Sequence, residues 1–166
     1  MTDYWNKDTL ILGCGNILFG DDGFGPAVVE HFQKNYHIPD HVGVINAGLS
    51  VREILFTLAL GEKRPQKIII VDAVDVGRPP GEIFELDVSE LPETKIDDFS
   101  MHQLPTSNLL RELKELCGVE VRIISTQVHH LPAEVCPGLS KVVADTIPAV
   151  CEKIREAVSP RIGEEA

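Results

Sequence analysis

The residues best suited to chemistry in this sequence begin with two adjacent aspartates, Asp21 and Asp22, in a glycine-rich loop. An apolar segment, residues 9–12, leads into the loop, and Pro26 follows it as a typical helix-starting residue. Glycines let a backbone turn tightly and lie close to another surface. Adjacent carboxylates are costly to crowd together without a cation or hydrogen-bond donors nearby. The loop is therefore predicted to hold something.

Two further residues, Asp72 and His102, could act together with this pair. Asp72 follows the apolar run of residues 68–71, and His102 lies in a loop just before a predicted helix. Ligands of open parallel sheets gather beyond the carboxyl ends of the strands. If the strand order begins 2-1-3, the acids after the first and third strands converge. Two carboxylates and one imidazole with open coordination positions suit nickel, zinc, iron or manganese.

Each of these residues also has an ordinary structural explanation. Either Asp21 or Asp22 could cap the helix that begins near Pro26. Asp72 could be a hydrogen-bonded turn residue at the end of a buried strand. A lone histidine such as His102 is more often a loop or helix-cap residue than a metal ligand. Taken singly, none of these signals is specific.

Several other residues carry weaker signals. His129 and His130 follow a predicted strand and could line the same cleft, although a structural or surface role is favoured. Asp75 could support the site or cap the turn after Asp72. Cys14 lies in the glycine loop, so a thiol nucleophile is conceivable, but the local sequence gives it no base.

Dinucleotide binding is the obvious competing interpretation of the glycine loop. A Gly-x-Gly after a first strand begins the dinucleotide-binding fingerprint, yet Leu18 stands in place of the third glycine. Two carboxylates beside a phosphate would repel it where backbone donors should attract it. The loop therefore does not favour a nucleotide.

The elements that must position these residues alternate along the chain. Mostly β-branched and apolar stretches predict strands at residues 10–13, 42–46, 67–73, 83–86 and 119–125. Apolar residues at helical spacing predict helices at residues 26–35, 51–60, 105–117 and 139–158. The alternation predicts a doubly wound α/β domain with a mostly parallel sheet, covered by helices on both faces.

Local signals mark some of the helix ends. Ser50 with Glu53 three residues later is predicted to form a capping box, and Gly61 to end that helix. Gly118 is predicted to end the third helix, and Pro148 to kink the last one.

Composition limits the class of protein. The chain has 166 residues, 43% of them hydrophobic and 25% charged, with a net charge of −11, and we expect one domain spanning residues 1–166. The acidic balance disfavours nucleic-acid binding, which needs a basic face. No apolar run approaches the roughly 20 residues that a bilayer requires, so no membrane association is expected. Four widely spaced cysteines without a CxxC pair are typical of reduced cytoplasmic thiols.

The loop pattern Gly13-x-Gly15-Asn16-x-Leu18-x-x-Asp21-Asp22-Gly23-x-Gly25 closely resembles the opening motif of the [NiFe]-hydrogenase maturation endopeptidases. The resemblance extends over nearly the whole chain. It implies a three-layer α/β/α fold of the phosphorylase/hydrolase-like kind, with a mostly parallel, twisted sheet of five strands. Among the subgroups, the chain looks most like the proteases for the deazaflavin-coenzyme-reducing hydrogenases of methanogens.

The resemblance also implies an activity and a site. The family removes a C-terminal extension from the hydrogenase large-subunit precursor after nickel insertion. Its metal-binding positions correspond here to Asp22, Asp72 and His102, with Asp22 and Asp72 also the catalytic candidates and Asp21 a structural acid. The nickel would be supplied by the substrate. Many relatives carry Glu where this chain has Asp22, and the shorter side chain would draw the metal toward the loop.

A second hypothesis assigns the same three residues to metal binding without catalysis. The chain would then be a non-catalytic nickel-sensing or chaperone module. In either case we expect a cytoplasmic protein, with a monomer favoured and the large-subunit precursor as its partner.

Overall fold

The structure of the protein is a computed structural model, in which residues 4–90 and 104–158 are described. Its centre is a five-stranded sheet in the order β2-β1-β3-β5-β4. The strands are β1 (Thr9–Cys14), β2 (Val42–Gly48), β3 (Lys67–Val74), β4 (Ile83–Leu86) and β5 (Glu120–Gln127). All neighbours run parallel except β4, which is antiparallel to β5 at one edge. The predicted mostly parallel α/β sheet is therefore confirmed.

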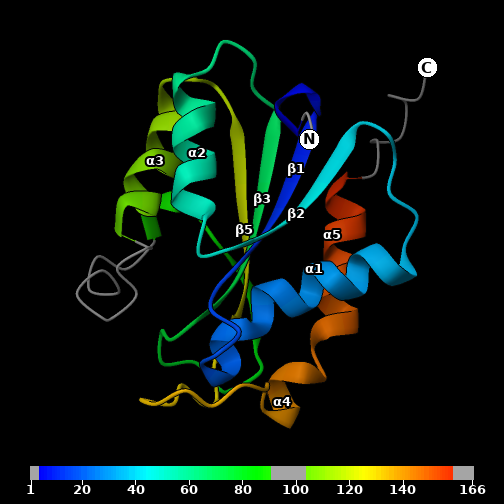
Figure 1. The fold of residues 1–166 in the computed structure, drawn as a ribbon, viewed down its shortest axis with the longest axis vertical. Coiled ribbons are helices and arrows are strands. Elements are labelled where there is room, and N and C mark those ends of the chain that lie inside the picture. The colour runs from blue at the N-terminus through cyan, green and yellow to red at the C-terminus, as the bar shows by residue number, and fades with distance from the viewer. Residues whose placement is uncertain (1–3, 91–103, 159–166) are drawn as a thin grey trace.

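Helices cover both faces of this sheet, so the molecule has three layers (Figure 1). The helices are α1 (Phe24–Asn35), α2 (Val51–Leu60), α3 (Leu104–Glu115), α4 (Lys141–Ala144) and α5 (Ile147–Val158). Short 3-10 helices occur at η1 (Tyr4–Asn6), η2 (Gly20–Gly23) and η3 (Val88–Glu90). Helices α2 and α3 pack on one face, and α1 and α5 on the other (Figure 1). Among the described residues, every helix falls short of the length and apolar character that a membrane span requires.

Each face of the sheet has its own apolar core. The alternating side chains of β3 contribute to both, with Ile68 and Ile70 in the cluster under α2 and α3, and Ile69 and Val71 in the cluster under α1 and α5. A strand buried on both faces has no solvent side for polar residues. This explains the continuous apolar run before Asp72.

Two predictions about the helices are wrong, one on a cap and one on the continuity of the last helix. Ser50 precedes α2, but its side chain makes no capping hydrogen bond, so the capping box is absent. The last predicted helix is two helices, because the chain leaves helical geometry between Ala144 and Ile147. Pro148 does not kink a continuous helix. It is the second residue of α5, in the first turn, where its missing N–H has no intrahelical partner to lose.

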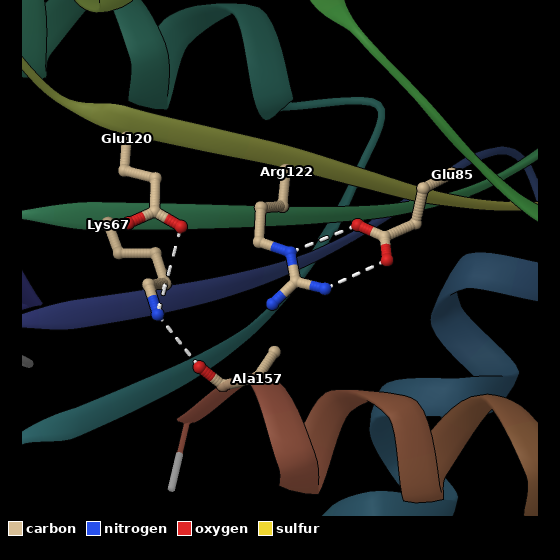
Figure 2. Close-up of polar contacts among 5 residues, drawn as sticks. All are labelled: Lys67, Glu85, Glu120, Arg122 and Ala157. Carbon is tan, nitrogen blue, oxygen red and sulfur yellow. Dashed lines mark hydrogen bonds and ion pairs between the residues drawn. The ribbon is translucent and has the colours of Figure 1, made fainter. Parts of the chain in front are cut away.

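Polar contacts fasten α5 and the edge strand β4 to the sheet, away from the carboxyl ends of β1 and β3 (Figure 2). Lys67, the first residue of β3, donates from Nζ to the Ala157 carbonyl oxygen at 2.8 Å and lies 3.9 Å from Glu120. Arg122 of β5 donates to both carboxylate oxygens of Glu85 at 3.0 and 2.8 Å. A two-bonded arginine–carboxylate pair is more specific in geometry than a single contact.

Candidate functional site

The predicted acids lie near the carboxyl ends of two neighbouring central strands. Asp21 and Asp22 lie in η2, which comes shortly after β1, and η2 packs against β3. Asp72 lies within β3, two residues before its end, and the strand ends one residue beyond the predicted range of 67–73. The sheet order confirms the predicted order 2-1-3. Because β1 and β3 are parallel neighbours, these acids lie at the same end of the sheet, where both strands finish.

The glycines of the loop allow backbones to touch. A Cβ on Gly25, at the start of α1, would lie 2.3 Å from the Cys14 carbonyl oxygen and 2.5 Å from that of Val71. Gly15 has a φ of +133°, and a Cβ there would lie 1.9 Å from the Asp22 carbonyl oxygen. The loop thus folds directly onto the ends of β1 and β3, which only glycine permits.

Asp21 is fully buried and saturated with hydrogen bonds. Its Oδ2 accepts from the backbone N–H groups of His129 and His130, both at 2.8 Å. Its Oδ1 accepts from the Ser140 backbone N–H at 2.7 Å, and the Ser140 hydroxyl lies 3.0 and 2.9 Å from the two oxygens. Asp21 is therefore a structural acid, as expected.

The surroundings of Asp21 also set its charge state. Burial by itself raises the pKa of this carboxyl, but the hydrogen bonds from Ser140, His130 and His129 lower it more, and the net pKa lies below the ordinary 3.8. Donors pointed at both oxygens stabilise the ionised form. Asp21 is thus a buried carboxylate held by amide and hydroxyl donors.

Asp22 has a different environment although it is the next residue. It is half-buried, and its Oδ2 accepts from the Asn16 backbone N–H at 2.8 Å. The Asn16 side chain in turn accepts from the Leu18 N–H at 3.0 Å, which holds the loop in a tight turn. Asp22 therefore keeps a fixed position while remaining partly open to solvent.

Asp72 is buried at the neighbouring strand end. Its register partner on β5 is Ser125, and it shares its sheet face with Ile70 and Val74, which belong to the core under α2 and α3. His102, the third predicted ligand, lies outside the described residues. Within the described ranges no group of three or more His, Cys, Asp or Glu residues could hold a metal ion. The three-residue metal set with His102 remains a prediction.

The weaker candidates have structural surroundings. His129 and His130 have exposed side chains, and their contribution to the loop is their backbone N–H groups. The structural or surface role that was favoured for them is confirmed. Cys14 is buried, and its thiol lies 3.8 Å from the Leu12 carbonyl oxygen. Its burial argues against a freely accessible thiol nucleophile.

Two residues of this region, Ser140 and Gln127, are not predicted from the sequence. Gln127 is buried at the end of β5, where its Oε1 accepts from the N–H groups of Val76 and Arg78 and its Nε2 donates to Asp75. It thereby fixes the turn that follows Asp72. Neither residue belongs to a local motif, and Ser140 is 119 residues from Asp21 in sequence. Only the fold brings them to the site.

Comparison with known proteins agrees with this architecture. The family model for hydrogenase maturation proteases matches residues 26–157. A protein of Methanocaldococcus jannaschii, named as a candidate hydrogenase maturation protease, is 43% identical over 149 residues, covering 89% of this chain and 94% of the relative. The coenzyme F420 hydrogenase subunit delta of Methanothermobacter thermautotrophicus is 35% identical over 158 residues, covering 93% and 96%.

A solved structure gives the same result. The hydrogenase maturating endopeptidase HybD of Escherichia coli superposes with a TM-score of 0.73 at 28% identity, covering 90% of this chain and 91% of that one. These matches do not support the non-catalytic alternative. The chain belongs to the hydrogenase maturation protease family and is an endopeptidase.

Proposed function

We propose that this chain removes a C-terminal extension from a [NiFe]-hydrogenase large-subunit precursor after nickel has been inserted. Asp22, Asp72 and His102 would recognise the nickel that the substrate carries. The observation that supports this most is the position of Asp22 and Asp72 at one edge of the neighbouring strands β1 and β3, in a chain of the maturation protease family.

The chemistry of these side chains suits nickel recognition. Carboxylate oxygen and imidazole nitrogen are both ligands that divalent nickel accepts. If the metal arrives with the substrate, binding depends on nickel loading, and unloaded precursor is left uncut. Nickel held by these residues would supply polarisation of the scissile carbonyl. Asp22 or Asp72 would then act as the general base that takes the proton of the attacking water.

The relatives suggest which precursor is cut. One of them is named as a subunit of a coenzyme F420 hydrogenase, and it covers 93% of this chain. We therefore propose the large subunit of a hydrogenase that reduces this deazaflavin coenzyme as the substrate. The four cysteines are free thiols, which supports a reducing compartment such as the cytoplasm.

The test is cleavage of purified precursor with and without nickel. We expect the wild-type chain to shorten only the nickel-loaded precursor, by the mass of one C-terminal peptide. Mass spectrometry of the intact large subunit measures that shift. Stable complex formation with loaded precursor but no cut would contradict the proposal.

Variants of the proposed ligands test the site. We expect Asp22→Ala, Asp72→Ala and His102→Ala each to abolish processing, while circular dichroism shows an unchanged fold, because each removes a metal ligand. Asp40→Ala, which removes an exposed acid in the loop before β2, is the matched control and retains processing. Full activity in any one of the three variants would remove that residue from the ligand set.

A further inference from the structure

We propose that Asp21 is a positioning residue for the cleavage reaction. Its carboxylate joins the loop of residues 15–23 to the segment of residues 129–140, and this junction fixes where Asp22 lies. We call the contacts between Asp21 and that segment the Asp21 lock. The inference rests on the proposed role of Asp22, but the lock itself can be tested without cleavage.

The lock joins parts of the chain that are far apart in sequence. Both oxygens of Asp21 accept from His129, His130 and Ser140, which lie 108 to 119 residues away. All the backbone donors lie at 2.7 to 2.8 Å, at the short end of the range for N–H···O bonds. Short bonds to an ionised acceptor are roughly twice as strong as bonds between neutral groups.

Backbone contacts extend the same junction on both sides of Asp21. The Asp21 N–H donates to the His130 carbonyl oxygen at 3.0 Å, and the Gly20 N–H to that of Cys136 at 2.9 Å. The Cys136 N–H donates back to Leu18 at 2.8 Å. A Cβ on Gly20 would lie 2.6 Å from Pro132, so the two segments are in direct contact. They therefore form one unit.

The position of Asp22 is fixed by this unit. It is the next residue along η2, and its own N–H donates to the Phe19 carbonyl oxygen at 3.0 Å. Its carboxylate accepts from Asn16 in the same loop. If the loop came away from residues 129–140, Asp22 would move relative to Asp72, which belongs to β3. A displacement of about 1 Å in a reacting group can cost about 100-fold in rate.

The chemistry of the lock requires a carboxylate. Both of its oxygens face N–H donors, and an asparagine in the same place would turn its NH₂ group toward at least one of them. The opposed donor would then be buried without an acceptor. The near-isosteric substitution Asp21→Asn therefore disrupts the lock without creating a cavity.

The first measurement is steady-state cleavage of nickel-loaded precursor. We expect Asp21→Asn to lower kcat/KM by about 100-fold while the far-ultraviolet circular dichroism stays that of the folded protein. Ser140→Ala removes only the hydroxyl and is expected to lower kcat/KM by about tenfold. Ser140→Thr restores a hydroxyl and is expected to recover most of that loss.

The second measurement is amide hydrogen exchange. It distinguishes a loosened loop, in which only the amides of the loop exchange faster, from a general loss of stability, in which core amides also exchange faster. We expect Asp21→Asn to speed exchange of the Asn16 N–H far more than exchange of core amides such as that of Ile69. The matched control is Lys67→Met, which breaks the contact with Ala157 away from the site (Figure 2). That variant should lower stability but leave kcat/KM and the ratio of the two exchange rates unchanged.

The outcomes separate the lock from the proposed function. Wild-type kcat/KM in folded Asp21→Asn, or a loss no larger than its unfolded fraction, would overturn the lock. If Asp21→Asn does not fold, equal activity of Ser140→Ala and Ser140→Thr would overturn it instead. Uncut precursor with wild-type protein would refute the proposed function, and with it any role of Asp21 in cleavage. The exchange rates of Asn16 and Ile69 would still decide whether Asp21 holds the loop in place.

Discussion

At the scale of single residues, Asp21 and Asp22 show how strongly surroundings decide what a side chain does. Both are aspartates in the same 3-10 turn, yet Asp21 is fully buried among donors while Asp22 is half-buried with one backbone N–H on its carboxylate. A buried carboxylate with both oxygens satisfied has little capacity left for a ligand. The two aspartates are therefore distinguished by their environment rather than by their type, and of the two only Asp22 remains partly exposed.

The lowered pKa of Asp21 predicts how stability depends on pH. A carboxyl whose pKa is lower in the folded than in the unfolded chain contributes stability above its unfolded pKa and loses it as pH falls through its folded pKa. We therefore expect the free energy of unfolding to fall as the pH decreases through and below the ordinary Asp pKa of 3.8. Asp21→Asn should make that decline less steep. Urea unfolding at several pH values measures both slopes, and identical slopes would contradict the assignment.

At the scale of elements, the contact between β1 and α1 positions the whole loop. Gly13 and Gly25 face each other across this contact, where a Cβ on either would lie within 2.4 Å of a carbonyl oxygen. Backbones this close leave no room for a side chain, so the start of α1 is held against the ends of β1 and β3. The loop that carries Asp22 connects the end of β1 to the start of α1.

Substitution of two glycines tests that contact. We expect Gly25→Ala to destabilise the protein by about 3 kcal/mol or more, because the added methyl overlaps two backbone carbonyl oxygens. Gly118→Ala is the comparison, since a Cβ there meets nothing within 4 Å and only the φ of +72° is unfavourable. It should cost about 1 kcal/mol. Chemical denaturation measures both, and equal losses would contradict the close-contact explanation.

At the scale of the whole molecule, the sheet separates two apolar cores. Leu58 of α2 belongs to the core on one face, and Ile154 of α5 to the core on the other, and both side chains are almost completely buried. β1, β3 and β5 contribute side chains to both cores. Loss of packing on one face therefore weakens the strands on which the other face depends.

This shared sheet predicts cooperative unfolding. We expect Leu58→Ala and Ile154→Ala each to cost about 2–5 kcal/mol, because each leaves a cavity in a closely packed core. Both should move the same single transition, seen alike by circular dichroism and by calorimetry. Two separate transitions, with each variant shifting only one of them, would refute the prediction of a single domain over residues 1–166.

The sequence by itself determined the alternation of strands and helices and the glycine loop with its two acids. These features depend on neighbours a few residues apart: the apolar run before Asp72, the helical spacing in residues 51–60, the glycines around Asp22. The strands were found within one or two residues. The order 2-1-3 was inferred from the fold class, and it suffices to bring the ends of β1 and β3 together.

The tertiary structure alone decided which polar groups meet. Ser50 carries a perfect local capping signal but makes no capping bond, whereas Ser140 carries no signal and binds Asp21 from 119 residues away. Gln127 likewise reaches back 52 residues to Asp75. Such contacts are set by how the elements pack and by the need to satisfy every buried donor and acceptor, which no local pattern encodes. The two aspartates were visible in the sequence, but only the fold decided that Asp21 is buried among hydrogen-bond donors and that Asp22 stays partly exposed.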